Sequence, residues 1–293
     1  MMPPRGGWNN PQGLPLLVPM SPLHPLPWLI ERRRIGAEAM HFPVTEDWQQ
    51  GRTCYGGLIS TLAVVAMRDL AGPAFAPQAG LRSLQTCFVA PVVPGEVEIG
   101  VRLLRQGRNL CQVQAEARQA GSVAALLIGV FGADRASVLA PRRPERPAPS
   151  FAADALPAPP PRPQGGPTFL QHFDMRWDDG PPPYSGGQGH RTRIHLRLAR
   201  DEAAALSAEL QTVLLADLPP TPVIGQLRQP SANSSVSWAL ELRPVQSGSA
   251  QGWWRSDNES VMVEGGYVNH VSRLWAPDGA LAAFGSQVVA VFT

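Results

Sequence analysis

An aspartate stands at the end of an apolar stretch in "LLADLPPTPV", residues 214–223. Leu210, Leu214 and Asp217 recur at helical spacing, so the carboxylate shares the helix face that meets the core. Burial and the negative end of a helix dipole both raise the pKa of a carboxylate. A carboxylate with a raised pKa suits a general base that takes a proton from water. The residues alone also allow an exposed aspartate in the turn before Pro219.

Gln287 is a polar residue in the apolar segment "ALAAFGSQVVAVF" near the C-terminus. Both faces of this segment are nearly apolar, which predicts a central, buried strand. A buried amide side chain requires hydrogen-bond partners. A bound water would be one such partner and the core backbone another, and the residues alone leave both open.

The pair Gly56-Gly57 precedes a long apolar segment. The free amides at a helix N-terminus carry partial positive charge and can stabilise a carbonyl oxygen as it becomes anionic. Glycine has no side chain, so such an oxygen could approach closely. A tight turn that only glycine can form is the alternative.

Two blocks of periodic sequence must position these groups. The first, residues 40–134, has a strand candidate, an apolar helix at 55–72 and four strand-like runs separated by turns. The second, residues 168–293, repeats this order, with one helix predicted over 200–218. A segment rich in proline, alanine and arginine, residues 135–167, reads as a linker between them.

The order of elements predicts an α+β fold. Residues 1–39 are repeatedly interrupted by proline, which predicts a disordered N-terminal extension. A single helix wrapped by a curled antiparallel sheet is the hotdog architecture. Two such units in one chain would form a double hotdog, an internal pseudo-dimer whose sheets meet edge to edge. The pattern alone leaves this as one of several α+β layouts.

The composition argues against several classes of function. The 293 residues have a formal net charge of +2 and no lysine, and the arginine clusters lie outside the periodic segments, so nucleic-acid binding is not expected. No apolar run approaches the length of a membrane span. The three cysteines and six histidines form no metal-binding motif, which predicts reduced thiols, a cytoplasmic location and no metal. His270 is expected on a strand surface.

Several stretches resemble the double-hotdog acyl-CoA thioesterases, the type II acyl-CoA thioesterase group. They are "CYGGLISTLAVVAM", "LRSLQTCFVAPVVPGEVEIGVRLLRQGRN" and "APDGALAAFGSQVVAVF". The similarity covers roughly residues 40–134 and residues 170–293, and the matching segments come in the same order along the chain. It implies a double-hotdog fold, an acyl-CoA substrate, hydrolysis to a free acid and CoA, and neither metal nor other cofactor.

The resemblance also implies the site residues. Members of the family hold and activate a water with an Asp, a Ser or Thr, and a Gln, which fall on Asp217, Ser235 and Gln287. An ungapped comparison instead places the hydroxyl on Ser234. The choice between these two neighbouring serines is therefore open. The thioester carbonyl should lie between Gly57 and Asp217, at the seam of the halves.

Two further expectations concern the pattern around these residues. Ser235 and Ser237 should share one strand face, opposite Trp238. Gly129 stands in the first block where Gln287 stands in the second, counted from the turn glycines, so one half alone should keep a complete set.

Two other functions remain open for the same fold. A non-hydrolytic protein would bind acyl-CoA and release no thiol. A hydratase of the hotdog type would use a histidine and an aspartate, and no histidine lies near either predicted helix in sequence. A homo-oligomer is compatible with either reading.

Overall fold

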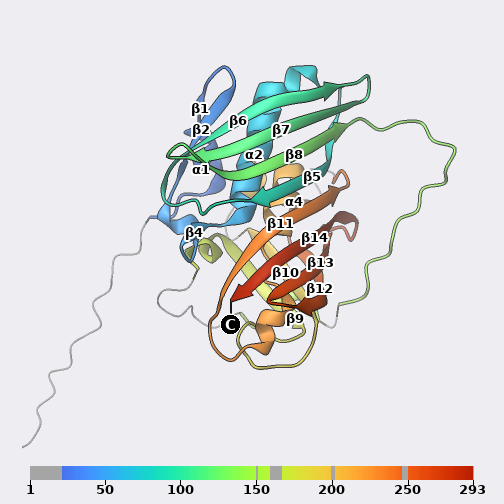
Figure 1. Cartoon of the computed structure of the whole chain (residues 1–293). Helices are drawn as coiled ribbons and strands as arrows, with labels where there is room; N and C mark the ends of the chain where they lie inside the picture. The colour runs from blue at the N-terminus through green and yellow to red at the C-terminus, as the bar shows by residue number, and fades with distance from the viewer. Residues whose placement is uncertain (1–21, 150, 159–166, 199–201, 246–249, 293) are drawn as a thin grey trace, which may run out of the picture.

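The chain forms a long antiparallel sheet that curls around two central helices (Figure 1). The computed structural model describes residues 22–149, 151–158, 167–198, 202–245 and 250–292. Within these ranges, one 12-stranded sheet has the order β1-β2-β6-β7-β8-β5-β11-β14-β13-β12-β10-β9, and β3 pairs with β4 apart from it.

The first half of the sheet wraps α2, whose residues are buried on almost every side. An apolar helix needs such a covering, since a helix that is apolar all round is stable in a core. The alternating burial along β7 puts one face of that strand on the core, as strand periodicity predicts. The elements of this half are α1 (Leu26–Glu31), β1 (Arg34–Ile35), β2 (Ala39–Val44), β3 (Gln49–Gln50), β4 (Thr53–Cys54), α2 (Gly56–Ala71), β5 (Gly80–Phe88), β6 (Gly95–Gln106), β7 (Leu110–Gln119) and β8 (Ser122–Gly132).

The second half repeats this arrangement around a shorter helix. The single helix predicted over 200–218 is wrong, because the segment forms two helices with Ser207 between them. The Ser207 side chain accepts a hydrogen bond from the Leu210 amide and so caps the second helix. The elements of this half are β9 (Phe173–Asp179), β10 (Arg191–Leu198), α3 (Glu202–Ala205), α4 (Ala208–Ala216), β11 (Ala232–Leu242), β12 (Trp254–Glu264), β13 (Tyr267–Trp275) and β14 (Leu281–Phe292).

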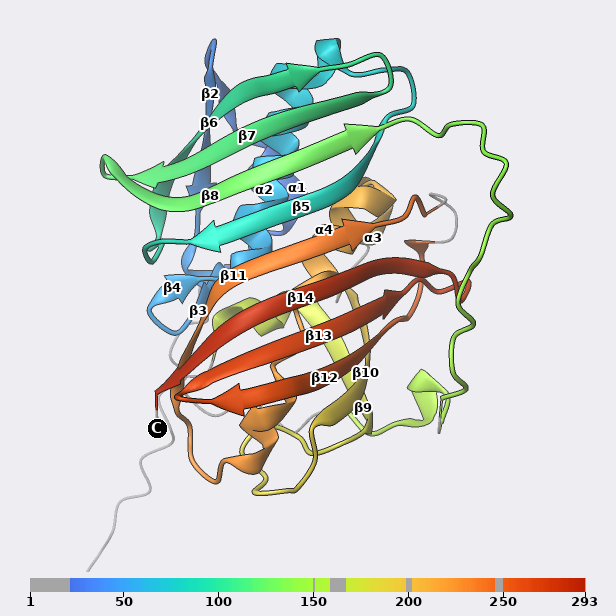
Figure 2. The same ribbon diagram turned by 45° about the vertical axis from the view of Figure 1, so that its right-hand side comes forward.

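The halves join edge to edge through β5 and β11, which pair antiparallel at the centre of the sheet. Outward from this seam, both halves have the same order of strands, and α2 packs against α4 on one side of the sheet (Figure 2). The predicted double-hotdog α+β architecture is therefore confirmed. The seam matters for function because it brings the start of α2 to the end of α4.

The predicted disorder of residues 1–39 is wrong for its described part, and residues 1–21 lie outside the described residues. Here α1 buries Leu26 and Leu29 completely in the core. Its prolines stand at the N-cap and in the first turn, where a helix tolerates them because those amides have no intrahelical partner. Trp48 donates a hydrogen bond from Nε1 to the His24 carbonyl at 2.8 Å and ties the segment to the first half.

The described part of the predicted linker 135–167 leaves the end of β8 and loops around the outside of the sheet to the second half (Figure 1). Arg255 donates from Nη1 to the Pro147 carbonyl at 2.5 Å, and Trp253 donates from Nε1 to the Asp154 carboxylate at 2.8 Å. Such contacts fix the path of the segment even though it adds little apolar burial. No helix in the described ranges has the length and apolar composition needed to cross a membrane.

Candidate active site

Asp217 caps the C-terminus of α4, the position that the sequence predicts. The residue is only partly buried, so it is not sealed from solvent. Burial of the carboxylate raises its pKa from 3.8 to about 7, while hydrogen bonds from Gln287 and from the Gly57 backbone oppose that rise. The carboxylate can therefore exchange a proton near neutral pH.

Gln287 joins the carboxylate to a hydroxyl. Its Nε2 donates to Asp217 Oδ1 at 2.9 Å and to Ser235 Oγ at 2.7 Å. These two bonds use both hydrogens of the amide nitrogen. The structure thus brings together Asp217, Ser235 and Gln287 from α4, β11 and β14, although 70 residues separate the first from the last in sequence.

A β-bulge in β11 decides which serine faces Gln287. The pairing of β11 with β14 shifts register between Ser235 and Ser237. Ser235 consequently lies on the same side as the buried Trp238, so the predicted shared face of Ser235 and Ser237 is wrong. Ser234 is exposed and its hydroxyl donates to the Ser235 carbonyl, so Ser235 and not Ser234 contacts Gln287.

Gly56 and Gly57 bring the start of α2 against Asp217. The Gly57 amide donates its hydrogen bond to the Asp217 carboxylate, so in this structure the acid itself occupies the predicted carbonyl position. A Cβ on Gly56 would lie 3.0 Å from Asp217 Oδ2 and 2.9 Å from the Phe88 ring. A side chain there would displace one of these groups, which is a tertiary reason for glycine.

Tyr55 connects the two helix ends behind this contact. Its hydroxyl donates to the Leu214 carbonyl of α4 at 2.5 Å, and its ring stacks on Phe169 at a centroid distance of 4.4 Å. Burial, and then the nearby Asp217 charge, raise the pKa of Tyr55 well above its usual value. Tyr55 thus stays neutral and fixes the distance between α2 and α4.

His270 lies next to Gln287, a position that sequence reasoning missed. It was predicted on a strand surface, but it is 5% exposed and pairs across the strands with Gln287. Its Nε2 lies 3.4 Å from Asn258 Oδ1. Burial lowers the pKa of His270 to about 4, and the neighbouring Gln287 side chain opposes the shift, so the ring is neutral near pH 7.

The corresponding place in the first half lacks the set. Gln287 lies on β14 beside the bulge of β11 at Ser235, whereas Gly129 lies on β8 beside a bulge of β5 at Leu81. Apolar or small residues thus replace the amide and the hydroxyl. A Cβ on Gly129 would lie 2.6 Å from Met67 Sδ, so packing fills this space.

An ion pair closes the other junction between the two helices, where α4 begins and α2 ends. Arg68 donates to Glu209 from Nε at 2.9 Å and from Nη2 at 2.5 Å, and the Leu81 amide donates to the same carboxylate at 2.7 Å. All these bonds are internal to the protein. The arrangement is that of a structural contact between the two helices.

We expect Glu209→Ala to lower stability without changing catalysis. The variant leaves the Arg68 guanidinium and the Leu81 amide without their acceptor, which typically costs about 1–3 kcal/mol. Equilibrium urea unfolding measures this loss, and steady-state kinetics below the unfolding transition should give kcat and KM within about twofold of wild type. A tenfold fall in kcat would instead place this junction in the catalytic machinery.

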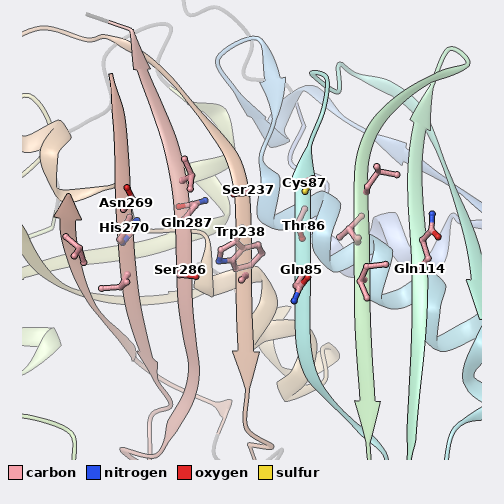
Figure 3. Close-up of a pocket in the computed structure, with 17 residues that line it drawn as sticks. Gln85, Thr86, Cys87, Gln114, Ser237, Trp238, Asn269, His270, Ser286 and Gln287 are labelled. Carbon is pink, nitrogen blue, oxygen red and sulfur yellow. The ribbon is translucent and has the colours of Figure 1, made fainter. Parts of the chain in front are cut away.

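A cavity of about 630 Å³ lies over β14 and the strands on either side of it, and its lining includes Gln287 and His270 (Figure 3). Ser286 and Val288 line it, and they point away from the site because side chains alternate along β14 on either side of Gln287. Within the described ranges, no three His, Cys, Asp or Glu side chains are grouped to hold a metal ion.

The chain matches two family models, described as the acyl-CoA thioesterase N-terminal domain over residues 44–132 and the C-terminal domain over residues 151–291. A comparison with the sequences of curated proteins finds no match.

Several solved structures share the fold over nearly their whole length. A conserved protein of unknown function with a hotdog fold from Alicyclobacillus acidocaldarius has a TM-score of 0.76 at 17% identity, covering 90% of this chain and 97% of its own. A tesB protein of Mycobacterium avium subsp. paratuberculosis has 0.69 at 17%, covering 92% and 98%. Acyl-CoA thioesterase II TesB2 of Mycobacterium marinum has 0.68 at 16%, covering 90% and 96%.

Proposed function

The chain belongs to the acyl-CoA thioesterase family, and on this premise we propose that Asp217, Gln287 and Ser235 activate a water that hydrolyses an acyl-CoA thioester. The observation that carries the proposal is the pair of hydrogen bonds by which Gln287 joins the carboxylate to the hydroxyl. These two bonds place the Asp217 carboxylate and the Ser235 hydroxyl around a common point. A water at that point would be held by both groups and deprotonated by Asp217.

The donors and acceptors of the site define where the water would bind. Ser235 Oγ accepts from Gln287, so the Ser235 hydrogen remains free to donate. A water between Ser235 and Asp217 would accept that hydrogen and donate one of its own to the carboxylate. Asp217 is then the general base, and Gln287 and Ser235 orient the nucleophile.

The reaction balances with these groups alone. The water oxygen forms a bond to the thioester carbonyl carbon while Asp217 takes a proton from the water. The tetrahedral oxyanion collapses, the carbon–sulfur bond breaks, and the proton passes to the departing CoA thiolate. The products are a carboxylic acid and free CoA, and nothing is oxidised or reduced.

We place the developing oxyanion at the N-terminus of α2. The partial positive charge of a helix N-terminus stabilises an anion, and Gly56, which has no side chain, lets this terminus lie close to Asp217. The Gly57 amide donates to Asp217. In the complex, the carbonyl oxygen would share or replace Asp217 as acceptor of this amide.

We place the acyl chain along the apolar side chains that adjoin the site. Val289 follows Gln287 on the same face of β14 and packs with Val268 and Val223 in a small apolar cluster. This cluster lies between the sheet and the segment after α4. The CoA moiety then extends outward from the seam.

Two further expectations stay predictions: that the protein is cytoplasmic and that it forms a homo-oligomer.

The test is thiol release by the full chain from a panel of acyl-CoAs of different lengths. We expect release of one CoA thiol per acid formed, followed with a thiol reagent. Cys87 is exposed and would react with the same reagent, so Cys87→Ser provides the background-free enzyme. Binding without thiol release would identify an acyl-CoA-binding protein, and hydration of an enoyl-CoA would identify a hydratase; either result overturns the proposal.

A further inference from the structure

Phe88 brings an aromatic ring from the first half of the chain to the candidate site. It is the last residue of β5, and it faces the helices because side chains alternate along the strand from the buried Leu84. A Cβ on Gly56 would lie 2.9 Å from Phe88 Cζ and 3.0 Å from Asp217 Oδ2. The ring and the carboxylate therefore approach the same point at the start of α2.

The ring lies where the apolar interior reaches solvent. Phe88 packs against the hydrophobic core but is only half-buried. The groups of the candidate site are half-buried as well: Asp217, Ser235 and Gln287. An aromatic ring at this border removes water from the first-half side of the carboxylate, and it offers no group that could hydrate a charge in its place.

The order of strands puts Phe88 and the small apolar cluster on opposite sides of the site. From the first half to the second, the sheet runs β5, β11, β14, β13. Phe88 lies on the first of these strands and Ser235 on the second. Ser235 pairs with Val289 on β14, and Val289 pairs with Val268 on β13. A chain that follows the two valines therefore leads away from the ring.

The second half supplies an internal comparison. The strands β5 and β11 are equivalent, and Leu84 corresponds to Trp238 by their pairing with β8 and β14. Four residues farther along each strand, Phe88 corresponds to Leu242, which is 2% exposed. The half-buried aromatic ring is thus a feature of the Asp217 end of the seam and not a requirement of the strand pairing.

We infer that Phe88 is a specificity-determining residue, whose ring closes the first-half side of the site and favours acyl groups without a branch at the carbon next to the thioester carbonyl. With the carbonyl between Gly57 and Asp217, a substituent on that carbon that points to the first half would meet the ring. A straight chain has no such substituent and runs along Val289. This inference rests on the proposed function, because it describes the acyl group of that reaction.

The same ring affects the proton equilibrium of the acid. Asp217 must be ionised to act as a base, so activity falls as pH drops through its pKa near 7. Without the ring, water reaches the carboxylate and stabilises its charged form, so the acid limb should move to lower pH. Two titratable side chains lie close by: Tyr55, held neutral by burial, and His270, with a pKa of about 4. Neither titrates near pH 7, so the limb reports on Asp217.

The experiment measures kcat/KM of the full chain for two substrates. One is the straight acyl-CoA of the length that wild type hydrolyses best, and the other is the same acyl-CoA with a methyl group on carbon 2. We expect wild type to favour the straight substrate about tenfold or more, the usual effect of one methyl group in a closed site. Phe88→Ala should reduce this preference to about twofold and lower the acid limb by about half a pH unit. Phe88→Leu, the residue of the equivalent place, should give an intermediate preference.

The control is Phe284→Ala, which removes a half-buried phenylalanine from β14 three residues before Gln287, on the opposite face of the strand. It should leave both the preference and the limb unchanged. Equal hydrolysis of the two substrates by wild type would overturn the inference, and so would an unchanged preference in Phe88→Ala. If Phe88→Ala does not fold, an unchanged preference in Phe88→Leu is the contradicting result. The proposed function fails separately, by full activity of Asp217→Asn or by absence of thiol release in wild type.

Discussion

The Asp217→Asn variant should lose at least about a hundredfold in kcat, since general-base catalysis typically contributes 10²–10⁴-fold. The amide retains the shape of the carboxylate and can still accept from Gln287 Nε2, the contact that measures 2.9 Å in the wild type. It cannot take a proton from water. The chemical step should therefore fail while substrate binding persists, so KM should change little. Steady-state and single-turnover thiol release measure the two parameters.

A matched control exists at the end of the other helix. Asp69 lies in the last turns of α2, is partly exposed and pairs with Arg33 Nε at 2.8 Å. Asp69→Asn makes the same chemical change at a surface ion pair of small energetic value, so kcat should stay at the wild-type level. Wild-type turnover in Asp217→Asn would remove Asp217 from the mechanism.

The second large effect is on the pH dependence of stability. Ionisation of Asp217 is required for catalysis, whereas the same ionisation lowers the free energy of unfolding. The pKa of Asp217 is about 7 in the folded protein against 3.8 for an unperturbed aspartate. The folded state thus holds this proton more tightly than the unfolded state, and stability falls as pH rises from about 4 to 7, then levels off. A difference of about three pKa units corresponds to about 4 kcal/mol.

Asp217→Asn removes this dependence. Between pH 4 and pH 8, wild type should lose about 4 kcal/mol more unfolding free energy than the variant. Equilibrium urea unfolding at both pH values gives the double difference. Other shifted groups cancel because both proteins carry them: Asp47, for example, has a pKa lowered to about 2 by its hydrogen bonds to His172 and the His24 amide, despite burial. Equal pH profiles for the two proteins would show that the carboxylate is not desolvated.

The local pattern predicted more of the fold than of the site. Apolar periodicity along α2 and alternation along the strands are properties of short segments, so the blocks and their double-hotdog arrangement could be inferred. The break between α3 and α4 could not, because Ser207 caps a helix only where its neighbours allow the turn. The helix α1 was missed for a related reason. Its prolines suggested disorder, whereas burial of Leu26 and Leu29 against the first half stabilises the helix.

For the candidate site, the local sequence pattern pointed to the acid and the amide but not to the distance between them. Asp217 could be recognised from its place at the end of an apolar helix, and Gln287 from its place in an apolar strand. Their separation of 2.9 Å depends on the packing of α4 against β14, which no local pattern encodes. The same packing supplies the desolvation that raises the Asp217 pKa.

Register shifts between strands decided which residues of β11 and β13 lie next to Gln287. Counting back from the β13–β14 turn would pair His270 with Ser286, but the irregularity between Leu274 and Trp275 moves the pairing by one residue to Gln287. The bulge in β11 likewise selects Ser235 over Ser234. A strand changes face with every residue, so one inserted residue reverses which side chains are buried. The sequence by itself thus determined which chemical groups are available, whereas tertiary packing decided which of them come into contact.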